Sequence, residues 1–510
     1  MLALLAVVAA ATSPQLLDVK VDNGSTPFFR DGRYLTTVSP NGDGFRDAAH
    51  VAFRLTAPAT VQLDVLQTDT QRGERATTTL VQSLRRSFAA GPAELVWRPA
   101  RAITPRTYQL RLRVNGRLVA GRRPVVRVQG IDAGFPQPSY APGQQASVWV
   151  ATDAKSLTFQ VFAYGGGSFP SVRDLRTSGE AMTAAARVDW SAHRDAAATI
   201  RVVRPGDWPS GLYFLRISAD DGRVGYAPFV VRPRALGRHR VAVVLATQTW
   251  QAYNFADANG DGWGDSWYAN ARQRNVDLTR AYLDFGLPFR FHDWDLTFMT
   301  WLQQAGKQAD FLTDQDLDAV ASGDALARAY DLIVFPGHEE YVTPHELEAV
   351  TRFRDLGGNL AFLAANNMFW QVAIDGPLMH KVKQWGQAGA SLTGVHYAGS
   401  NHGRVQKPFV VTGADRAPWL FTGTGLQNGS TFGTYGIEID ATGPATPPGT
   451  IVLARIPDLL GRGRSAEMTY YETAAGAKVF AAGALNFAAS ATSEPVSTLL
   501  GNLWARISVP

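Results

Sequence analysis

The 510-residue chain contains no cysteine. It therefore has no disulfide bonds, no thiolate metal site and no cysteine nucleophile. Its lysines and arginines are scattered and the formal net charge is only +5, so the chain lacks the basic stripe that nucleic-acid binding needs. It also lacks a glycine-rich phosphate loop, which leaves nucleotide cofactors without support.

Long apolar runs are missing too, apart from one at the amino terminus. Residues 1–13 (MLALLAVVAAATS) are apolar and end in small residues, and Ala9, Ala10 and Ala11 fit a signal-peptide cleavage site. The usual basic residues are absent before it, so we expect the true start to lie upstream. No other run reaches about 18 apolar residues, which predicts no membrane-spanning helix. We expect a secreted or cell-envelope protein, and the sequence does not indicate its oligomeric state.

Residues 17–128 are predicted to form a β-sandwich. Apolar and polar residues alternate in short runs that turn signals separate, and no amphipathic helix intervenes. The runs are 51–57, 61–67, 93–99 and 107–114. The motif SPNGDGFRD (39–47), the strand after it and Trp97 resemble the Ig-like repeats of bacterial envelope proteins and of the flagellar hook-capping protein.

The same motif has two explanations. Asn41, Asp43 and Asp47 place oxygen atoms at alternate positions around a glycine turn, which suits a hard cation such as Ca²⁺. The other explanation, which we favour, is an Asx-type turn that leads into a strand.

Residues 133–233 are predicted to form a second sandwich of the Ig-like kind. Its strands are expected at 145–152, 157–165, 212–218 and 226–233. Only the short segment 234–238 follows, so this unit is expected to pack on the next domain.

Residues 239–510 change to an α/β pattern. Continuously apolar strands are expected at 241–247, 331–337 and 359–365, and they alternate with expected helices at 273–285, 295–305 and 344–356. This alternation predicts a parallel sheet covered on both faces. After about residue 390 the β pattern returns, and we expect a final helix near 494–506.

Polar side chains gather where these strands end. The turn after the strand 332–335 holds His338, Glu339, Glu340 and Tyr341. Thr343 and Glu346 form a capping box that starts the next helix, with Pro344 at its first position. Ligands bind beyond the carboxyl ends of strands in open α/β sheets. The other strand ends are expected to add Gln251, Tyr253, Asn254, Asn366 and Asn367.

These side chains could supply a general base, an oriented water and oxyanion donors. No Ser or Cys stands at a strand–turn–helix elbow, which disfavours an acyl-enzyme and favours an activated-water hydrolase. A solvated loop that merely starts a helix explains the turn equally well. Extra metal donors could come from His292, Asp293, Asp295, His396 and His402, although surface or packing roles suit each one better.

A second candidate cation loop is DANGDGWGDSWY (257–268). Its ligands would be Asp257, Asn259, Asp261 and Asp265, at positions 1, 3, 5 and 9 of an EF-hand-like loop. Position 12 is Tyr268 instead of Glu, so we expect a structural Ca²⁺ rather than a sensor site.

Aromatic residues are frequent near the expected site. They are Trp250, Trp263, Trp267, Trp294, Trp301, Phe369 and Trp370. Exposed Trp beside acids is typical of sugar binding, whereas core packing is the other explanation and the one we favour for Trp301.

Several motifs in one order resemble the large (β) subunit family of N,N-dimethylformamidase, especially its C-terminal domain. They are ATQTWQAYN (246–254), FHDWDLTFMTWLQQAG (291–306), VFPGHEEYVT (334–343), LGGNLAFLAANNMFW (356–370), LTGVHY (392–397), TGTGL (422–426) and FAAGALNF (480–487). The resemblance covers about 133–510. It implies a flavodoxin-like sheet akin to glutamine amidotransferase domains.

The resemblance also implies the hydrolysis of a small amide with one iron, held by two tyrosines and one carboxylate. Tyr341 matches one tyrosine position. The second tyrosine position corresponds to Phe298 and the carboxylate position to Ser391, so two of the three ligands are absent and retained iron is not expected.

Two hypotheses follow. The chain is either a hydrolase of a C–N bond or a related polar substrate, centred on Tyr341, His338 and Glu340, or a non-catalytic envelope protein that binds a glycan or polymer. The polar strand-end cluster favours the first, and the missing iron ligands favour the second.

Overall fold

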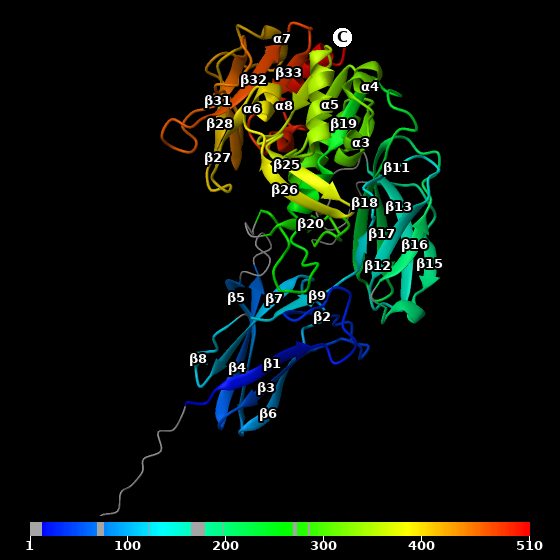
Figure 1. Ribbon diagram of the computed structural model, residues 1–510, viewed down its shortest axis with the longest axis vertical. Coiled ribbons are helices and arrows are strands. Elements are labelled where there is room, and N and C mark those ends of the chain that lie inside the picture. Colours follow the sequence, from blue (N-terminus) through cyan, green and yellow to red (C-terminus); the bar gives the residue numbers. More distant parts are fainter. Residues whose placement is uncertain are drawn as a thin grey trace, which may run out of the picture.

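The computed structural model describes residues 13–68, 76–121, 123–164, 179–196, 198–268, 273–283 and 286–509. The leader expected over 1–13 therefore lies outside the described residues, apart from residue 13. The protein has several domains and is rich in β-structure: small, mostly antiparallel sheets come first, and a mixed sheet with parallel strands and helices follows (Figure 1). Within the described ranges, no helix is both long and apolar enough to cross a membrane.

The first unit consists of two sheets that share one core. One sheet contains β1 (Leu16–Asp22), β3 (Ala49–Leu55) and β6 (Gly91–Trp97). The other contains β2 (Leu35–Val38), β9 (Val125–Val128), β7 (Thr107–Val114), β4 (Ala59–Thr68) and β5 (Ala76–Phe88), with β8 (Arg117–Leu118) beside β7. Alternate residues of β3 and β7 face inward, as the alternating sequence predicts. Trp97 is fully buried between the sheets, and its indole N–H donates to Gln82 at 3.0 Å.

The second unit has the same two-sheet construction. Its smaller sheet contains β10 (Asp132–Gly134), β12 (Ala146–Ala151) and β16 (Thr199–Val203). The larger sheet contains β11 (Ser139–Tyr140), β18 (Val224–Val231), β17 (Gly211–Ala219), β13 (Ser156–Tyr164), β14 (Gly179–Ala181) and β15 (Ala186–Asp189). Ser139 donates to Asp316 of the following unit at 2.7 Å, and Arg232 lies 3.7 Å from the same carboxylate. The unit therefore packs on the α/β part, as the short linker predicts.

A nine-stranded sheet forms the centre of the third unit. Five parallel neighbours are β21 (Asp310–Thr313), β19 (Val241–Leu245), β22 (Leu332–Phe335), β24 (Asn359–Phe362) and β33 (Lys478–Ala481). The sheet continues through the antiparallel strands β32 (Ala466–Glu472), β31 (Ile451–Ile456), β28 (Gln406–Val411) and β29 (Thr431–Gly436). The sheet is therefore mixed, not wholly parallel as expected. The turns that join β31, β32 and β33 are too short for the crossover that parallel neighbours require.

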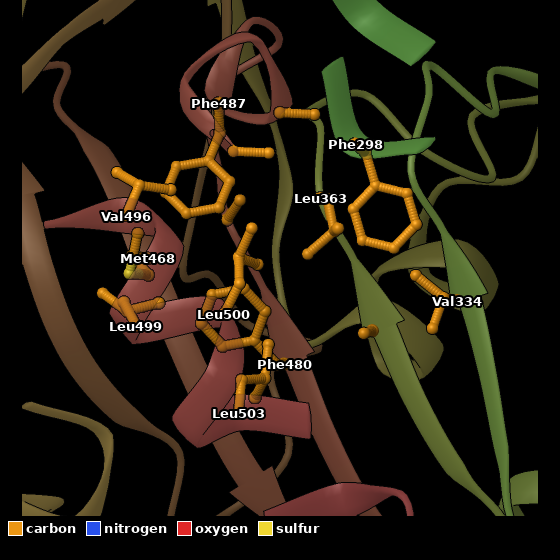
Figure 2. Close-up of a cluster of buried hydrophobic side chains, with 14 of the residues drawn as sticks. Phe298, Val334, Leu363, Met468, Phe480, Phe487, Val496, Leu499, Leu500 and Leu503 are labelled. Atoms are coloured by element: carbon orange, nitrogen blue, oxygen red, sulfur yellow. The ribbon is translucent and has the colours of Figure 1, made fainter. Parts of the chain in front are cut away.

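Both faces of the parallel half are buried, as predicted. Along β19, Val241, Val243 and Leu245 enter one core, while Ala242 and Val244 enter the other. One face is covered by α3 (Asp314–Asp318), α4 (Gly323–Ala329), α5 (Pro344–Asp355) and α6 (Gln387–Thr393), and the other by α2 (Thr297–Gln304) and α8 (Val496–Ile507). Figure 2 shows part of the core on the α2 and α8 face, where Phe298 lies beside Val334 and Leu363, and Leu503 lies beside Phe480.

The local predictions differ in outcome. Helix α5 begins at the predicted capping box, where the Thr343 hydroxyl accepts from the Glu346 amide, and α8 matches the expected final helix. The helix expected over 273–285 is wrong, because its described residues form β20 (Asn275–Asp277) and turns. That strand pairs with β26 (Leu378–Gln384) in a small sheet, so tertiary pairing prevails over local helix periodicity. The same sheet contains β25 (Trp370–Asp375) and β23 (Tyr341–Val342).

Candidate functional site

Four separate elements bring polar side chains to the carboxyl edge of the parallel strands. Tyr253 caps the end of α1 (Thr247–Ala252), the turn after β22 carries His338 and Glu340, and Tyr341 begins β23. The fifth member, Glu438, begins β30 (Glu438–Ala441), which pairs with β27 (His396–Ser400). All five side chains are buried. We call Tyr253, His338, Glu340, Tyr341 and Glu438 the strand-end cluster.

Hydrogen bonds fix the proton positions in the cluster. The His338 Nδ1 lies 2.8 Å from the carbonyl oxygen of Ala365, which can only accept. The Tyr253 hydroxyl donates a hydrogen bond to Glu340 at 2.5 Å. The His338 Nε2 lies 3.0 Å from the Tyr253 hydroxyl oxygen and 3.3 Å from Glu340. This nitrogen therefore needs a proton of its own, which makes His338 an imidazolium.

The electrostatics agree with that assignment. Burial lowers the pKa of His338, but its hydrogen bond to Glu340 and the charges of Glu438 and Glu340 outweigh burial and raise the pKa to about 9. Burial raises the pKa of Glu340, yet the bonds from His338 and Tyr253 bring it below its ordinary value. Burial, together with the Glu340 charge, raises the pKa of Tyr253 and of Tyr341 well above 10. Both phenols are therefore neutral donors at neutral pH.

Two acids of the site are absent from the sequence-based set. Burial raises the pKa of Glu438 to about 7, and its carboxylate lies 3.8 Å from His338 Nε2. Burial also raises the pKa of Asp440 to about 7. The signal was the alternation in IEID (437–440), which places two acids on one face of a strand. Sequence reasoning missed it because β30 is remote in the chain from the other strand ends.

The other expected residues lie around the cluster with different partners. Asn366 contacts the cluster, because its side-chain amide donates to Glu438 at 2.9 Å. Its backbone N–H donates to Asp440. Asn367 accepts from the Glu339 backbone. Asn254 instead bonds to Gln251 and to the Ala281 carbonyl. These last contacts organise the loop after α1 and not the cluster.

Glu339 points away from the cluster, toward a second group of buried acids. Its neighbours there are Asp314 and Glu346, and Gln248 connects the group by donating to Asp314 and Glu346. Burial raises the pKa of Glu339 well above 4.5, and the Asp314 charge adds to this rise. Successive side chains along 338–340 therefore point in opposite directions: His338 and Glu340 face the strand-end cluster, and Glu339 faces the second group of acids.

Aromatic rings enclose the strand-end cluster. The Tyr341 ring lies 4.9 Å from Trp267, and the Tyr253 ring lies 5.2 Å from Tyr268. The indole nitrogens of Trp267 and Trp294 are buried without a hydrogen-bond partner among the described groups. Trp267 and Trp294 share one apolar cluster with Tyr253 and Tyr341. Phe369 packs on Tyr397, Trp250 and Trp301 lie in the core, and Trp263 is exposed.

The other expected metal donors are scattered. Asp295 is buried and accepts from the Trp250 indole at 3.3 Å, His396 and His402 are on the surface, and the side chains of 292 and 293 lie outside the described residues. In the part of the chain that the structure describes, no three His, Asp or Glu side chains form a group that could hold a metal ion.

The loops expected to bind cations are held by their own backbone amides. Asp257 accepts from the N–H groups of Gly260 and Gly262, each at 2.7 Å, and Asp265 accepts from the Ala258 backbone N–H and from the Asn259 side-chain amide. Asp261 accepts from the amide of Trp263. In the amino-terminal motif, Asn41 accepts from the backbone N–H of Asp43, and Asp43 accepts from that of Phe45, which is the pattern of an Asx-type turn. Asp47 also accepts from the N–H groups of Gly42 and Gly44.

The family model described as "N,N-dimethylformamidase beta subunit-like, C-terminal" matches residues 163–497, more than half of the chain. The chain belongs to this family. The N,N-dimethylformamidase beta subunits of Paracoccus aminophilus and of an Alcaligenes species are each 30% identical over 142 residues, which cover 26% of this chain and 18% of each relative. The matched region is thus under a fifth of the length of these curated relatives.

Solved structures add no further argument. The Yersinia pseudotuberculosis adhesin InvE is 16% identical, covers 38% of this chain and 56% of its own, and has a TM-score of 0.15. Red sea bream transglutaminase is 10% identical, with coverages of 42% and 31% and a TM-score of 0.19. These scores are too low to indicate a shared fold.

The positions that the resemblance assigned to iron ligands do not all lie together. Phe298 is buried in the apolar core (Figure 2), and the Ser391 hydroxyl donates to the Ala388 carbonyl on α6. Phe298 has no ligand atom, and the Ser391 hydroxyl already bonds to the backbone of its own helix. However, Tyr253 places a second phenol beside Glu340, with its ring 6.2 Å from that of Tyr341. Two tyrosines and a carboxylate, the donor types that the resemblance implies, thus meet at different positions.

Proposed function

We propose that the strand-end cluster is a hydrolytic centre that cleaves a C–N bond in a small polar substrate. The observation that carries this proposal is the convergence of two phenols, an imidazolium and two carboxylates in one buried, hydrogen-bonded group. Four separate elements supply that group at the carboxyl ends of parallel strands. A family relation to the dimethylformamidase beta subunit supports the choice of an amide as substrate class.

Glu438 would act as the general base for water. Its pKa of about 7 lies near a neutral working pH, where a carboxylate can both accept and return a proton. The Asn366 amide holds one of its oxygens at 2.9 Å. His338, positively charged and fixed by the Ala365 carbonyl, would donate a hydrogen bond to the oxygen that gains negative charge during attack.

In the metal-free form both tyrosines would remain protonated: Tyr341 would orient the substrate carbonyl, and Tyr253, whose hydroxyl donates to Glu340, would hold that carboxylate in place. Tyr253 is held by Glu340 and Tyr341 by the rings around it. If both phenols lost their protons, Tyr253, Tyr341 and Glu340 could instead hold an iron ion. When bound, such an ion would supply a Lewis acid that polarises a carbonyl.

The test is an amine-release assay with formamide and its N-methyl and N,N-dimethyl derivatives. Glu438→Gln should lower kcat/KM by about 10²- to 10⁴-fold, the usual contribution of a general base. Tyr330→Phe is the matched control, because Tyr330 is also buried and bonded to a carboxylate, Asp310, at 3.1 Å away from the cluster. Equal activity in Glu438→Gln and wild type would refute the assigned role.

Elemental analysis by plasma mass spectrometry separates the metal-assisted form from the metal-free form. About one tightly held iron per chain, lost in Tyr253→Phe, would support iron at the cluster. If no amide is cleaved and no metal is held, the non-catalytic alternative gains support. In that alternative, the Ig-like modules and the flavodoxin-like domain bind a glycan or polymer. A glycan-array screen would then be the next experiment.

A further inference from the structure

Lys381 stands out because its ammonium group lies among three aromatic rings. The Nζ atom lies 4.5 Å from the centroid of Trp370, 4.9 Å from that of Trp267 and 5.1 Å from that of Tyr341. Each distance is within the range of a cation–π interaction. Tyr341 is also a member of the strand-end cluster, so this arrangement shares one wall with the candidate site.

The strand register explains why this lysine faces inward. Lys381 on β26 pairs with Val372 of β25, and Lys383 pairs with Gln371. Val382 is therefore an extra residue, a bulge that turns the two lysines to opposite faces of the sheet. Lys381 shares its face with Val372 and with Met379, and both of these are fully buried. Lys383 is exposed.

The charge of Lys381 has a partner inside the site. Burial lowers the pKa of Lys381 below its ordinary value, and the Glu340 charge partly offsets that lowering; the lysine charge in turn lowers the pKa of Glu340. His338 is the other cation beside Glu340, and Glu438 the other acid. Two cations therefore face two carboxylates in this region.

We propose that Lys381 is a positioning residue of the strand-end cluster: its ammonium, held by Trp267, Trp370 and Tyr341, fixes the Tyr341 ring and places a positive charge beside Glu340. A lysine that served only as packing would contribute its apolar stem and leave its ammonium in water. Here the ammonium itself lies among the rings. The inference deepens the proposed function, since it concerns the same site.

The test separates charge from packing. Lys381→Ala removes both, Lys381→Met keeps an apolar stem, Lys381→Arg keeps the charge, and Lys383→Met is the matched control on the opposite face. Tryptophan emission and thermal stability are measured for each variant. Lys381→Ala is further titrated with propylammonium, which replaces the missing atoms, and with 1-propanol, which lacks the charge.

We expect Lys381→Ala and Lys381→Met to shift the emission spectrum and lower the melting temperature, with Lys381→Arg and Lys383→Met close to wild type. Propylammonium should restore the spectrum of Lys381→Ala saturably, and 1-propanol should not. Wild-type behaviour of Lys381→Met, or equal rescue by 1-propanol, would overturn the proposal. These readouts do not depend on turnover, so a failure to find amide hydrolysis would affect the proposed function alone.

Discussion

Glu339 is the residue whose environment most clearly conflicts with an ionised side chain. The Glu339 residue is 1% exposed. If Asp314 is ionised, neither carboxyl oxygen of Glu339 has an N–H or O–H donor among the described groups. A hydrogen bond between Glu339 and Asp314 requires one of the two acids to keep a proton. Burial and the Asp314 charge make Glu339 the protonated partner, with a pKa well above 4.5.

This raised pKa gives stability a definite pH dependence. The native state binds the Glu339 proton more tightly than the unfolded chain does, so its stabilising effect is complete below the unfolded pKa of about 4.3 and is lost as the pH rises toward the higher folded pKa. We therefore expect the free energy of unfolding to fall as the pH rises above the unfolded pKa of Glu339. Glu339→Gln, a neutral isostere, should make that fall smaller.

Urea unfolding at several pH values measures this effect. Glu348→Gln is the matched control, because Glu348 is an exposed glutamate on α5. The control should reproduce the wild-type pH dependence. An unchanged slope in Glu339→Gln would show that Glu339 is ionised in the native state.

At the level of single elements, the sequence predicts structure best where the signal is local. The start of α5 depends on Thr343, Pro344 and Glu346, which are neighbours, and the structure confirms it. The helix expected over 273–285 failed because β20 is specified by its partner β26, a hundred residues later. Glu438 was missed for the same reason: only tertiary structure brings β30 to the strand ends. Tyr253, His338 and Glu340 were found because each directly follows a local strand or helix signal.

The loop 257–265 carries a prediction at the same scale. Its carboxylates are close together, and burial raises the pKa of Asp257 to about 6, with Asp265 and Asp261 adding to the rise. A divalent cation would relieve this repulsion. If the loop binds Ca²⁺ in the native state only, saturation at about 100 times Kd should stabilise the protein by about 2.7 kcal/mol.

Thermal melts with CaCl₂, with MgCl₂ and with a chelator test this expectation. Ca²⁺ should raise the melting temperature, and Asp261→Asn should reduce that rise, because it removes one of the charges that face Asp257. Identical melting temperatures with Ca²⁺ and with the chelator would contradict calcium binding at this loop.

At the scale of the whole molecule, the first unit contacts the other two units through both backbone and side-chain groups. The Tyr34 N–H donates to the Gly260 carbonyl at 3.3 Å, and Arg30 forms an ion pair with Asp277 at 3.0 Å. Ser39 also donates to Asp153 of the second unit at 2.8 Å. The candidate calcium loop thus contacts the first unit directly, which connects the amino-terminal unit to the loop that follows α1 and Tyr253.

The contact between Gly32 and Gly260 allows this docking to be tested by a single methyl group. A Cβ atom at Gly32 would lie 2.5 Å from the Gly260 carbonyl oxygen and 2.8 Å from its Cα, so the backbones would have to separate. We expect Gly32→Ala to loosen the first unit and increase the radius of gyration in small-angle X-ray scattering, with an unchanged far-ultraviolet circular dichroism spectrum. Gly130→Ala is the control, since its Cβ would meet only the Val224 carbonyl oxygen at 3.8 Å. Equal scattering from the two variants would mean that this glycine contact does not hold the units together in solution.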